Sequence, residues 1–119
     1  MKYLFNNSCQ ENFWVRTTIM NSDIYNVEEI KLILKPVFEK NGINKAILFG
    51  SYARGIAKPN SDIDILVDSG LQGLDFFGLV EHVHMALKKT VDIIDITSLK
   101  KNSPIEKTIE KTGIVIYGK

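Results

Sequence analysis

Three aspartates are the side chains in this sequence best suited to chemistry on phosphate groups. Asp62 and Asp64 are two residues apart in the alternating segment Asp62-Ile63-Asp64-Ile65, which predicts a strand with both carboxylates on one face. Two such carboxylates repel each other unless a cation lies between them, and Mg²⁺ and Mn²⁺ prefer carboxylate oxygens. The pair therefore indicates a divalent metal site, with the polar face of an exposed edge strand as the alternative.

The third aspartate, Asp92, lies in the segment Val91-Asp92-Ile93-Ile94, which also predicts a strand. We expect its carboxylate to join those of Asp62 and Asp64 if the two strands lie side by side. Three carboxylates on one sheet face, with phosphate oxygens of a nucleotide, fit a two-ion phosphoryl-transfer centre. Asp95 would project to the opposite face, so we interpret it as a structural or solvated acid.

Gly50-Ser51 follows a short apolar run, residues 46–49, that predicts a buried strand. A glycine there lets the backbone approach a ligand closely, and a helical turn beginning at Ser51 would offer free N–H groups to a phosphate. The segment is not a Walker loop, because Ile56-Ala57 stand where that loop needs Lys and Ser or Thr. We expect Arg54 either to contact phosphate or to pair with an acid.

The elements that must position these residues alternate along the chain. Apolar periodicity, with capping-box patterns from Asn26 to Glu29 and from Ser103 to Glu106, predicts helices over residues 27–40, 74–89 and 104–112. It also predicts strands over 46–49, 63–67, 91–96 and 114–117. In the second helix we expect Phe76, Phe77, Val80, Val83, His84 and Leu87 to face inward, and we place Tyr52 and Lys58 at the surface near the site. The predicted fold class is α/β (α+β): a mixed β-sheet of about four strands with helices packed against it.

The spacing of the two motifs resembles a known family. Gly50-Ser51, ten further residues and then Asp62-Ile63-Asp64 match the G-S-x₁₀-D-x-D signature of the minimal nucleotidyltransferases in the DNA polymerase β superfamily. Residues 50–55 and 61–67 look like that family's two motif blocks, and residues 91–94 resemble its third-carboxylate strand. The resemblance covers about residues 26–119 and implies a polymerase-beta-like nucleotidyltransferase fold.

The resemblance also implies an activity: transfer of a nucleoside monophosphate, AMP from ATP, to a hydroxyl group with release of pyrophosphate. Asp62, Asp64 and Asp92 would be the catalytic residues and the ligands of two Mg²⁺ ions, with Mn²⁺ as a substitute. Gly50, Ser51 and Arg54 would bind the nucleotide.

Members of this family often act as the antitoxin of a HEPN-domain toxin, and some adenylylate a hydroxyl of that toxin. We therefore expect a HEPN-domain protein as partner and acceptor. Two alternatives remain open: a non-catalytic binding module that neutralises a toxin sterically, and a nucleotidyltransferase that acts on a small-molecule hydroxyl.

Composition limits the remaining function classes. The chain has 119 residues, 45% of them hydrophobic and 24% charged, which fits one globular domain. Its formal net charge of +1 argues against an electrostatic nucleic-acid clamp. No apolar run is long enough for a membrane span or a signal peptide, so we expect no membrane association and a cytoplasmic location. Seven lysines stand against four acids in residues 88–119. We interpret them as solvated helix ends, with an acidic partner surface as the alternative.

The first residues lack a clear period. We predict that residues 1–22 form an N-terminal extension, with Met20 as an alternative start of translation, and that residues 23–119 form the nucleotidyltransferase domain. The alternative for the extension is an extra helix or strand that packs on the domain.

Overall fold

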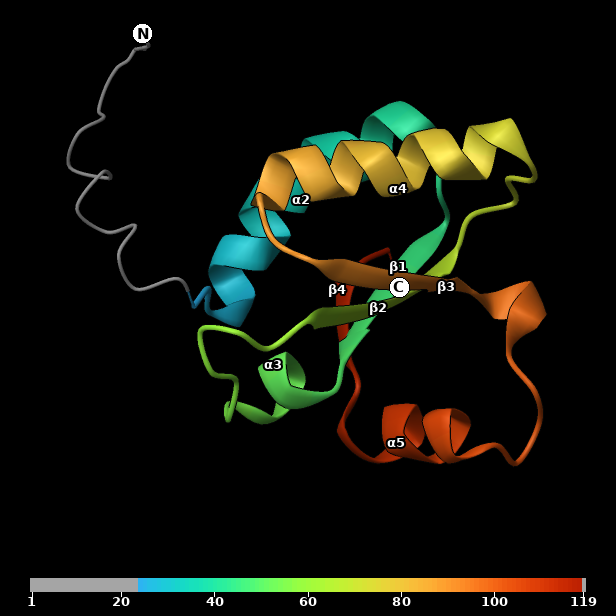
Figure 1. The fold of residues 1–119 in the computed structure, drawn as a ribbon. Coiled ribbons are helices and arrows are strands. Elements are labelled where there is room, and N and C mark those ends of the chain that lie inside the picture. Colours follow the sequence, from blue (N-terminus) through green and yellow to red (C-terminus); the bar gives the residue numbers. More distant parts are fainter. Residues whose placement is uncertain (1–23, 119) are drawn as a thin grey trace, which may run out of the picture.

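The structure is a computed structural model that describes residues 24–118. The predicted extension and the alternative start at Met20 lie outside the described residues. The described elements, labelled as in Figure 1, are α2 (Val27–Asn41), β1 (Lys45–Phe49), α3 (Ser51–Arg54), β2 (Ile63–Asp68), α4 (Leu74–Leu87), β3 (Val91–Asp95), the 3₁₀ turn η2 (Ile96–Ser98), α5 (Pro104–Thr112) and β4 (Ile114–Tyr117).

The strands form one mixed sheet in the order β3-β2-β1-β4, which confirms the predicted fold class. β1 runs antiparallel to both β2 and β4, whereas β2 and β3 are parallel and are joined by the crossover helix α4. The register sets Phe49 opposite Asp64 and Asp64 opposite Asp92. The two strands that carry the predicted acids are therefore neighbours.

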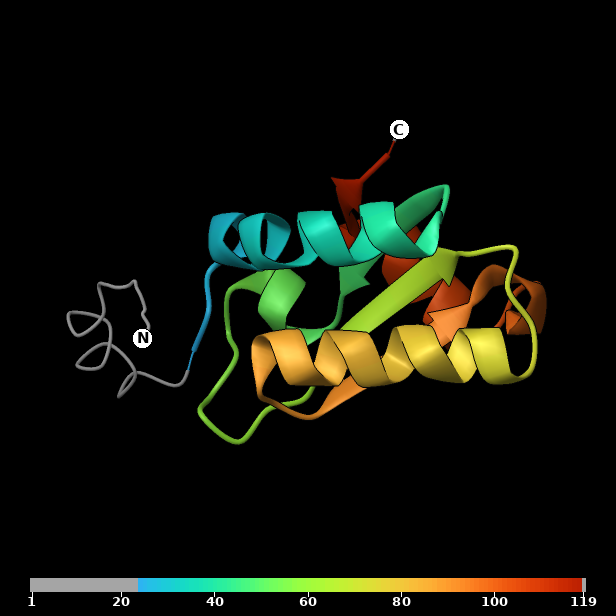
Figure 2. The ribbon, with the colours of Figure 1, turned by 90° about the horizontal axis from the view of Figure 1, so that it is seen from above.

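The two faces of the sheet have different covers. Helices α2 and α4 lie side by side over one face, and α3 and α5 lie on the other side of the sheet (Figures 1 and 2). Alternate residues of β2, Ile63, Ile65 and Val67, are fully buried in the core. Asp64 stands between them in sequence and projects to the opposite face. One strand therefore contributes to both the core and the candidate site.

Cap residues explain where the helices begin and end. The Asn26 side chain accepts a hydrogen bond from the backbone N–H of Glu29, whose carboxylate accepts one in return from the N–H of Asn26, both at 2.8 Å. This completes the predicted capping box. α2 ends at Gly42 in the left-handed conformation (φ 67°). α5 begins as predicted, with the Ser103 side chain as its cap and Pro104 in its first turn.

The inward face predicted for α4 was partly wrong. The buried residues of this helix are Leu79, Val83 and Leu87, whereas Phe77 is 67% exposed. Residues two positions apart in a helix are separated by roughly 200° around its axis. Phe77 must therefore point outward when Leu79 points inward. The helix is also shorter than predicted, because it ends where Lys88 adopts a left-handed conformation (φ 56°). None of the helices within residues 24–118 has the length and apolar character needed to span a bilayer.

The packing of α2 gives a matched test of the core. Leu34 is fully buried, and Leu32 of the same helix is 74% exposed. We expect Leu34→Ala to lower the free energy of unfolding by about 2–5 kcal/mol, because it removes buried apolar surface and leaves a cavity. Leu32→Ala should change it by less than about 0.5 kcal/mol. Urea denaturation measures both, and equal losses would contradict the described orientation of α2.

Candidate active site

Gly50 connects β1 to α3 in a conformation reserved for glycine. Its dihedral angles are φ 77° and ψ −154°. A Cβ atom at this position would also collide with the carboxylate of Asp64. Two independent constraints thus require glycine at this position. The absence of a Cβ atom lets the backbone at the start of α3 lie close to Asp64 of β2.

The short helix α3 presents the other residues of the first motif. Ser51 begins the helix and is half-buried, while Arg54 at its end is exposed. Within residues 24–118 the one ion pair joins Lys31 to Glu28 at 3.7 Å, so Arg54 pairs with no described acid. Tyr52 corrects our prediction of a surface residue: it is 4% exposed, and its hydroxyl has no hydrogen-bond partner among the described residues.

The three predicted acids come together on the sheet. Asp64 is half-buried in β2 directly opposite Asp92 of β3, and exposed Asp62 comes immediately before β2. Burial raises the pKa of Asp64, and the negative charges of Asp92 and then Asp62 raise it further. The carboxylates therefore repel one another in the absence of a cation.

The donor set fits a hard divalent cation, because the three carboxylates supply only oxygen and a cation would remove their repulsion. No group of three His, Cys, Asp or Glu side chains in residues 24–118 is arranged to hold a metal ion unaided. Phosphate oxygens of a nucleotide would supply the remaining ligands, as the sequence prediction requires. The roles of Asp62, Asp64 and Asp92 as ligands therefore stay a proposal.

Asp95, at the other end of β3, has a structural role. Its carboxylate accepts hydrogen bonds from the hydroxyls of Ser69 (2.5 Å) and Thr97 (2.6 Å) and from their backbone N–H groups. Burial alone would raise the pKa of Asp95, but these hydrogen bonds outweigh burial and hold it below its ordinary value. Asp95 thus ties the end of β3 to the end of β2 and takes no part in the acid cluster.

The turn before Asp62 is held from two directions. The Lys58 N–H donates to the Ser61 hydroxyl, and the Ser61 N–H donates to the Lys58 carbonyl, both at 2.9 Å. From outside, Lys89 Nζ donates to the Pro59 carbonyl at 3.0 Å. Lys89 is therefore not simply one of the solvated lysines, and no local sequence pattern indicates this contact between residues 30 positions apart.

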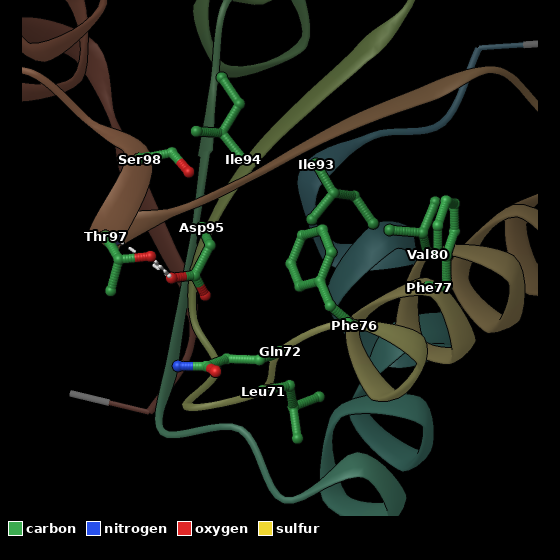
Figure 3. A pocket seen from close by; sticks show the side chains of 11 residues that line it. Leu71, Gln72, Phe76, Phe77, Val80, Ile93, Ile94, Asp95, Thr97 and Ser98 are labelled. Carbon is green, nitrogen blue, oxygen red and sulfur yellow. Dashed lines mark hydrogen bonds between the residues drawn. The ribbon is translucent and has the colours of Figure 1, made fainter.

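A pocket of about 510 Å³ lies at the far end of β3 from Asp92. Figure 3 shows Phe76, Phe77, Val80 and Ile93 around it, with Asp95 and Thr97 at its polar side. Asp95 is the one acid that lines this pocket, and Ser69 and Thr97 already occupy its oxygens. The pocket therefore lacks the groups for phosphate chemistry, which gather at the other end of the strand.

Comparison with known proteins identifies the family. The profile of the polymerase beta nucleotidyltransferase family matches residues 28–119, which include every predicted site residue. The chain belongs to this family. This nucleotidyltransferase is 42% identical over 96 residues to the protein adenylyltransferase MntA of Thermococcus cleftensis. The aligned residues cover 76% of this chain and 95% of that one.

Two further comparisons agree with this placement. A protein of Methanocaldococcus jannaschii, assigned as an adenylyltransferase, is 41% identical over 76 residues, which is 62% of this chain and 82% of that one. A solved toxin–antitoxin structure with AMP-PNP contains a chain of 26% identity and TM-score 0.64, with 75% of this chain and 73% of that chain covered. Nucleotidyltransferases of this family generally use divalent metal ions.

The repulsion at Asp64 predicts that the nucleotidyltransferase gains stability when this carboxylate is removed. Without metal at pH 7, Asp64→Asn should raise the free energy of unfolding by about 0.5–1 kcal/mol, a small value because solvent screens part of the repulsion. The pKa of Asp64 is raised in the folded state, so its penalty is present when it is ionised and disappears as pH falls through that pKa. The gain should therefore shrink at acid pH.

The control is Asp68→Asn, which lies on the same strand and face but opposite Lys45. It should give no gain, because Asp68 faces a cation. Denaturant unfolding at several pH values, with chelator present, measures both variants. A loss of stability in Asp64→Asn at neutral pH would contradict the repulsive cluster.

The close approach at Gly50 predicts a non-additive pair of substitutions. Gly50→Ala should cost about 1–3 kcal/mol, through its backbone conformation and its collision with Asp64. Gly42→Ala, at a left-handed position with nothing within 4 Å, should cost about 1 kcal/mol. Adding Asp64→Ala should recover part of the loss in the first variant and none in the second. Strict additivity in both denaturation cycles would refute the contact.

Proposed function

We propose that this nucleotidyltransferase transfers AMP from ATP to a hydroxyl group of a partner protein, and that the partner is a HEPN-domain toxin. The observation that carries the proposal is the acid cluster held against Gly50: Asp64 opposite Asp92, with Asp62 just before β2. The names of its relatives support the transferred group, since the Thermococcus protein is a protein adenylyltransferase of similar length. The toxin–antitoxin structure with AMP-PNP, an ATP analogue, supports a toxin as the partner.

In this proposal the chain's own residues act by positioning. Gly50 and Ser51 hold the β- and γ-phosphates, with Arg54 nearby at the end of α3. Asp62, Asp64 and Asp92 would hold two Mg²⁺ ions, for which Mn²⁺ could substitute. When bound, the ions neutralise charge on the triphosphate and on the leaving pyrophosphate.

Asp92 orients the acceptor hydroxyl and takes its proton. The acceptor oxygen then forms a bond to the α-phosphorus as the bond from that phosphorus to the bridging oxygen breaks, and pyrophosphate leaves. No covalent enzyme intermediate is required, since in-line placement and charge neutralisation supply the catalysis. Because the proposed reaction consumes ATP, we propose that it takes place in the cytoplasm.

The cluster also favours an enzyme over a steric binding module. A protein that only covers a toxin has no need for repelling carboxylates, which cost stability, or for a backbone at Gly50 that lies too close to Asp64 to admit a Cβ atom. An enzyme that acts on a small-molecule hydroxyl would differ from the proposed one only in which product carries the AMP. Labelled ATP therefore distinguishes the two.

The test uses purified chain, Mg²⁺, ATP labelled in its α-phosphate, and the protein encoded in the neighbouring reading frame, which we expect to carry a HEPN domain. We expect label on that protein, and a loss of about 10²–10³-fold or more in rate for Asp62→Asn, Asp64→Asn and Asp92→Asn. Asp68→Asn, on the same face of β2, should keep its activity.

The alternatives predict other results. Equal labelling by the wild type and all three variants would refute the metal role of the acids. Label found only in acid-soluble product would favour a small-molecule acceptor. Neutralisation of the toxin that survives all three substitutions, with no label transferred, would favour the steric module.

A further inference from the structure

We propose that Lys89 is a positioning residue, which holds the turn leading into Asp62 against the loop leading into Asp92. Its consequence for catalysis rests on the proposed function, whereas its consequence for the turn does not. The carrying observation is the hydrogen bond from Lys89 Nζ to the Pro59 carbonyl oxygen, 3.0 Å long and joining residues 30 positions apart.

Asp62 needs such a contact more than the other two acids. Asp64 and Asp92 lie inside paired strands, where ladder hydrogen bonds fix the backbone. Asp62 is exposed and precedes the first residue of β2, so its position depends on the turn formed by residues 58–61. That turn is closed internally by Ser61, and the contact from Lys89 joins it to the neighbouring loop.

The backbone beneath Lys89 is firmly held, so the side chain has a fixed base from which to reach Pro59. On its N-terminal side, the N–H of Lys88 donates to the His84 carbonyl at 2.8 Å, and the Tyr25 hydroxyl donates to the Leu87 carbonyl at 2.8 Å. On its C-terminal side, the N–H of Ile63 donates to the Thr90 carbonyl at 3.1 Å.

His84 fixes the same loop to the start of β3. Its Nε2 donates to the Val91 carbonyl at 2.8 Å, one residue before Asp92. The loop between α4 and β3 is thus held by α4 and by β2, and Lys89 extends this support to the turn before Asp62. The chain length of lysine and its ammonium donors allow a contact that a shorter side chain, or one without a donor, cannot make.

The direct test is hydrogen exchange in the metal-free protein, which needs no activity. Lys89→Met keeps most of the side-chain length and removes the donor. We expect the amide protons of Ser61 and Ile63 to exchange about three- to tenfold faster, the effect of losing one hydrogen bond. The matched control is Lys35→Met on the exposed surface of α2, which should leave these amides unchanged. The unfolding midpoints of both variants should stay close to that of the wild type.

The second readout is catalysis with labelled ATP. We expect Lys89→Met to lower kcat by a similar three- to tenfold and to raise the Mg²⁺ concentration needed for half-maximal rate, with the KM for the partner protein unchanged. Lys89→Arg, which keeps a donor of similar reach, should restore most of both readouts.

The outcomes separate the two proposals. Unchanged exchange at Ser61 and Ile63 in Lys89→Met overturns the inference, and so does faster exchange with unchanged kcat and Mg²⁺ dependence. A wild-type chain that transfers no AMP contradicts the proposed function, while the exchange result still decides whether Lys89 holds the turn.

Discussion

The candidate site depends on the repulsion between neighbouring carboxylates, which the fold holds close together. The parallel register of β2 and β3 sets Asp64 opposite Asp92. Gly50, which has no Cβ atom, lets the backbone lie close to the Asp64 carboxylate. Burial and neighbouring negative charge raise the pKa of Asp64, so the ionised cluster costs stability. Such a cost is tolerated where a bound cation and a polyanion relieve it, which is the arrangement that nucleotidyl transfer requires.

The core holds this arrangement from the opposite face of the sheet. The period of two in β2 sends Ile63, Ile65 and Val67 into the core beneath α2 and α4 and sends Asp64 the other way. A shift of one residue in register would bury the carboxylate and expose the core, so packing enforces the position of the acid. The face that carries the acids has α3 and α5 at its sides (Figure 1).

Local sequence patterns predicted much of the fold and of the candidate site, whereas the features that depend on long-range contacts were not predicted. The D-x-D spacing, the glycine after an apolar strand, and the cap residues Asn26 and Ser103 each follow from neighbours in sequence. The pairing of β3 with β2 required an assumption, because strand partners are not encoded locally. The outward position of Phe77, the burial of Tyr52 and the contact of Lys89 with Pro59 depend on how separate elements pack.

The central claim is that the acids and Gly50-Ser51 together bind a divalent cation with a nucleoside triphosphate. The most direct measurement is the NMR spectrum of the protein with the non-hydrolysable analogue α,β-methylene ATP, titrated with paramagnetic Mn²⁺. We predict that the broadening is strongest for the amide signals of Asp62, Asp64 and Asp92 and of the Gly50-Ser51 turn, and that it weakens with distance along β3 toward Asp95 and the pocket of Figure 3. Broadening centred elsewhere, or none at these residues, would contradict the account.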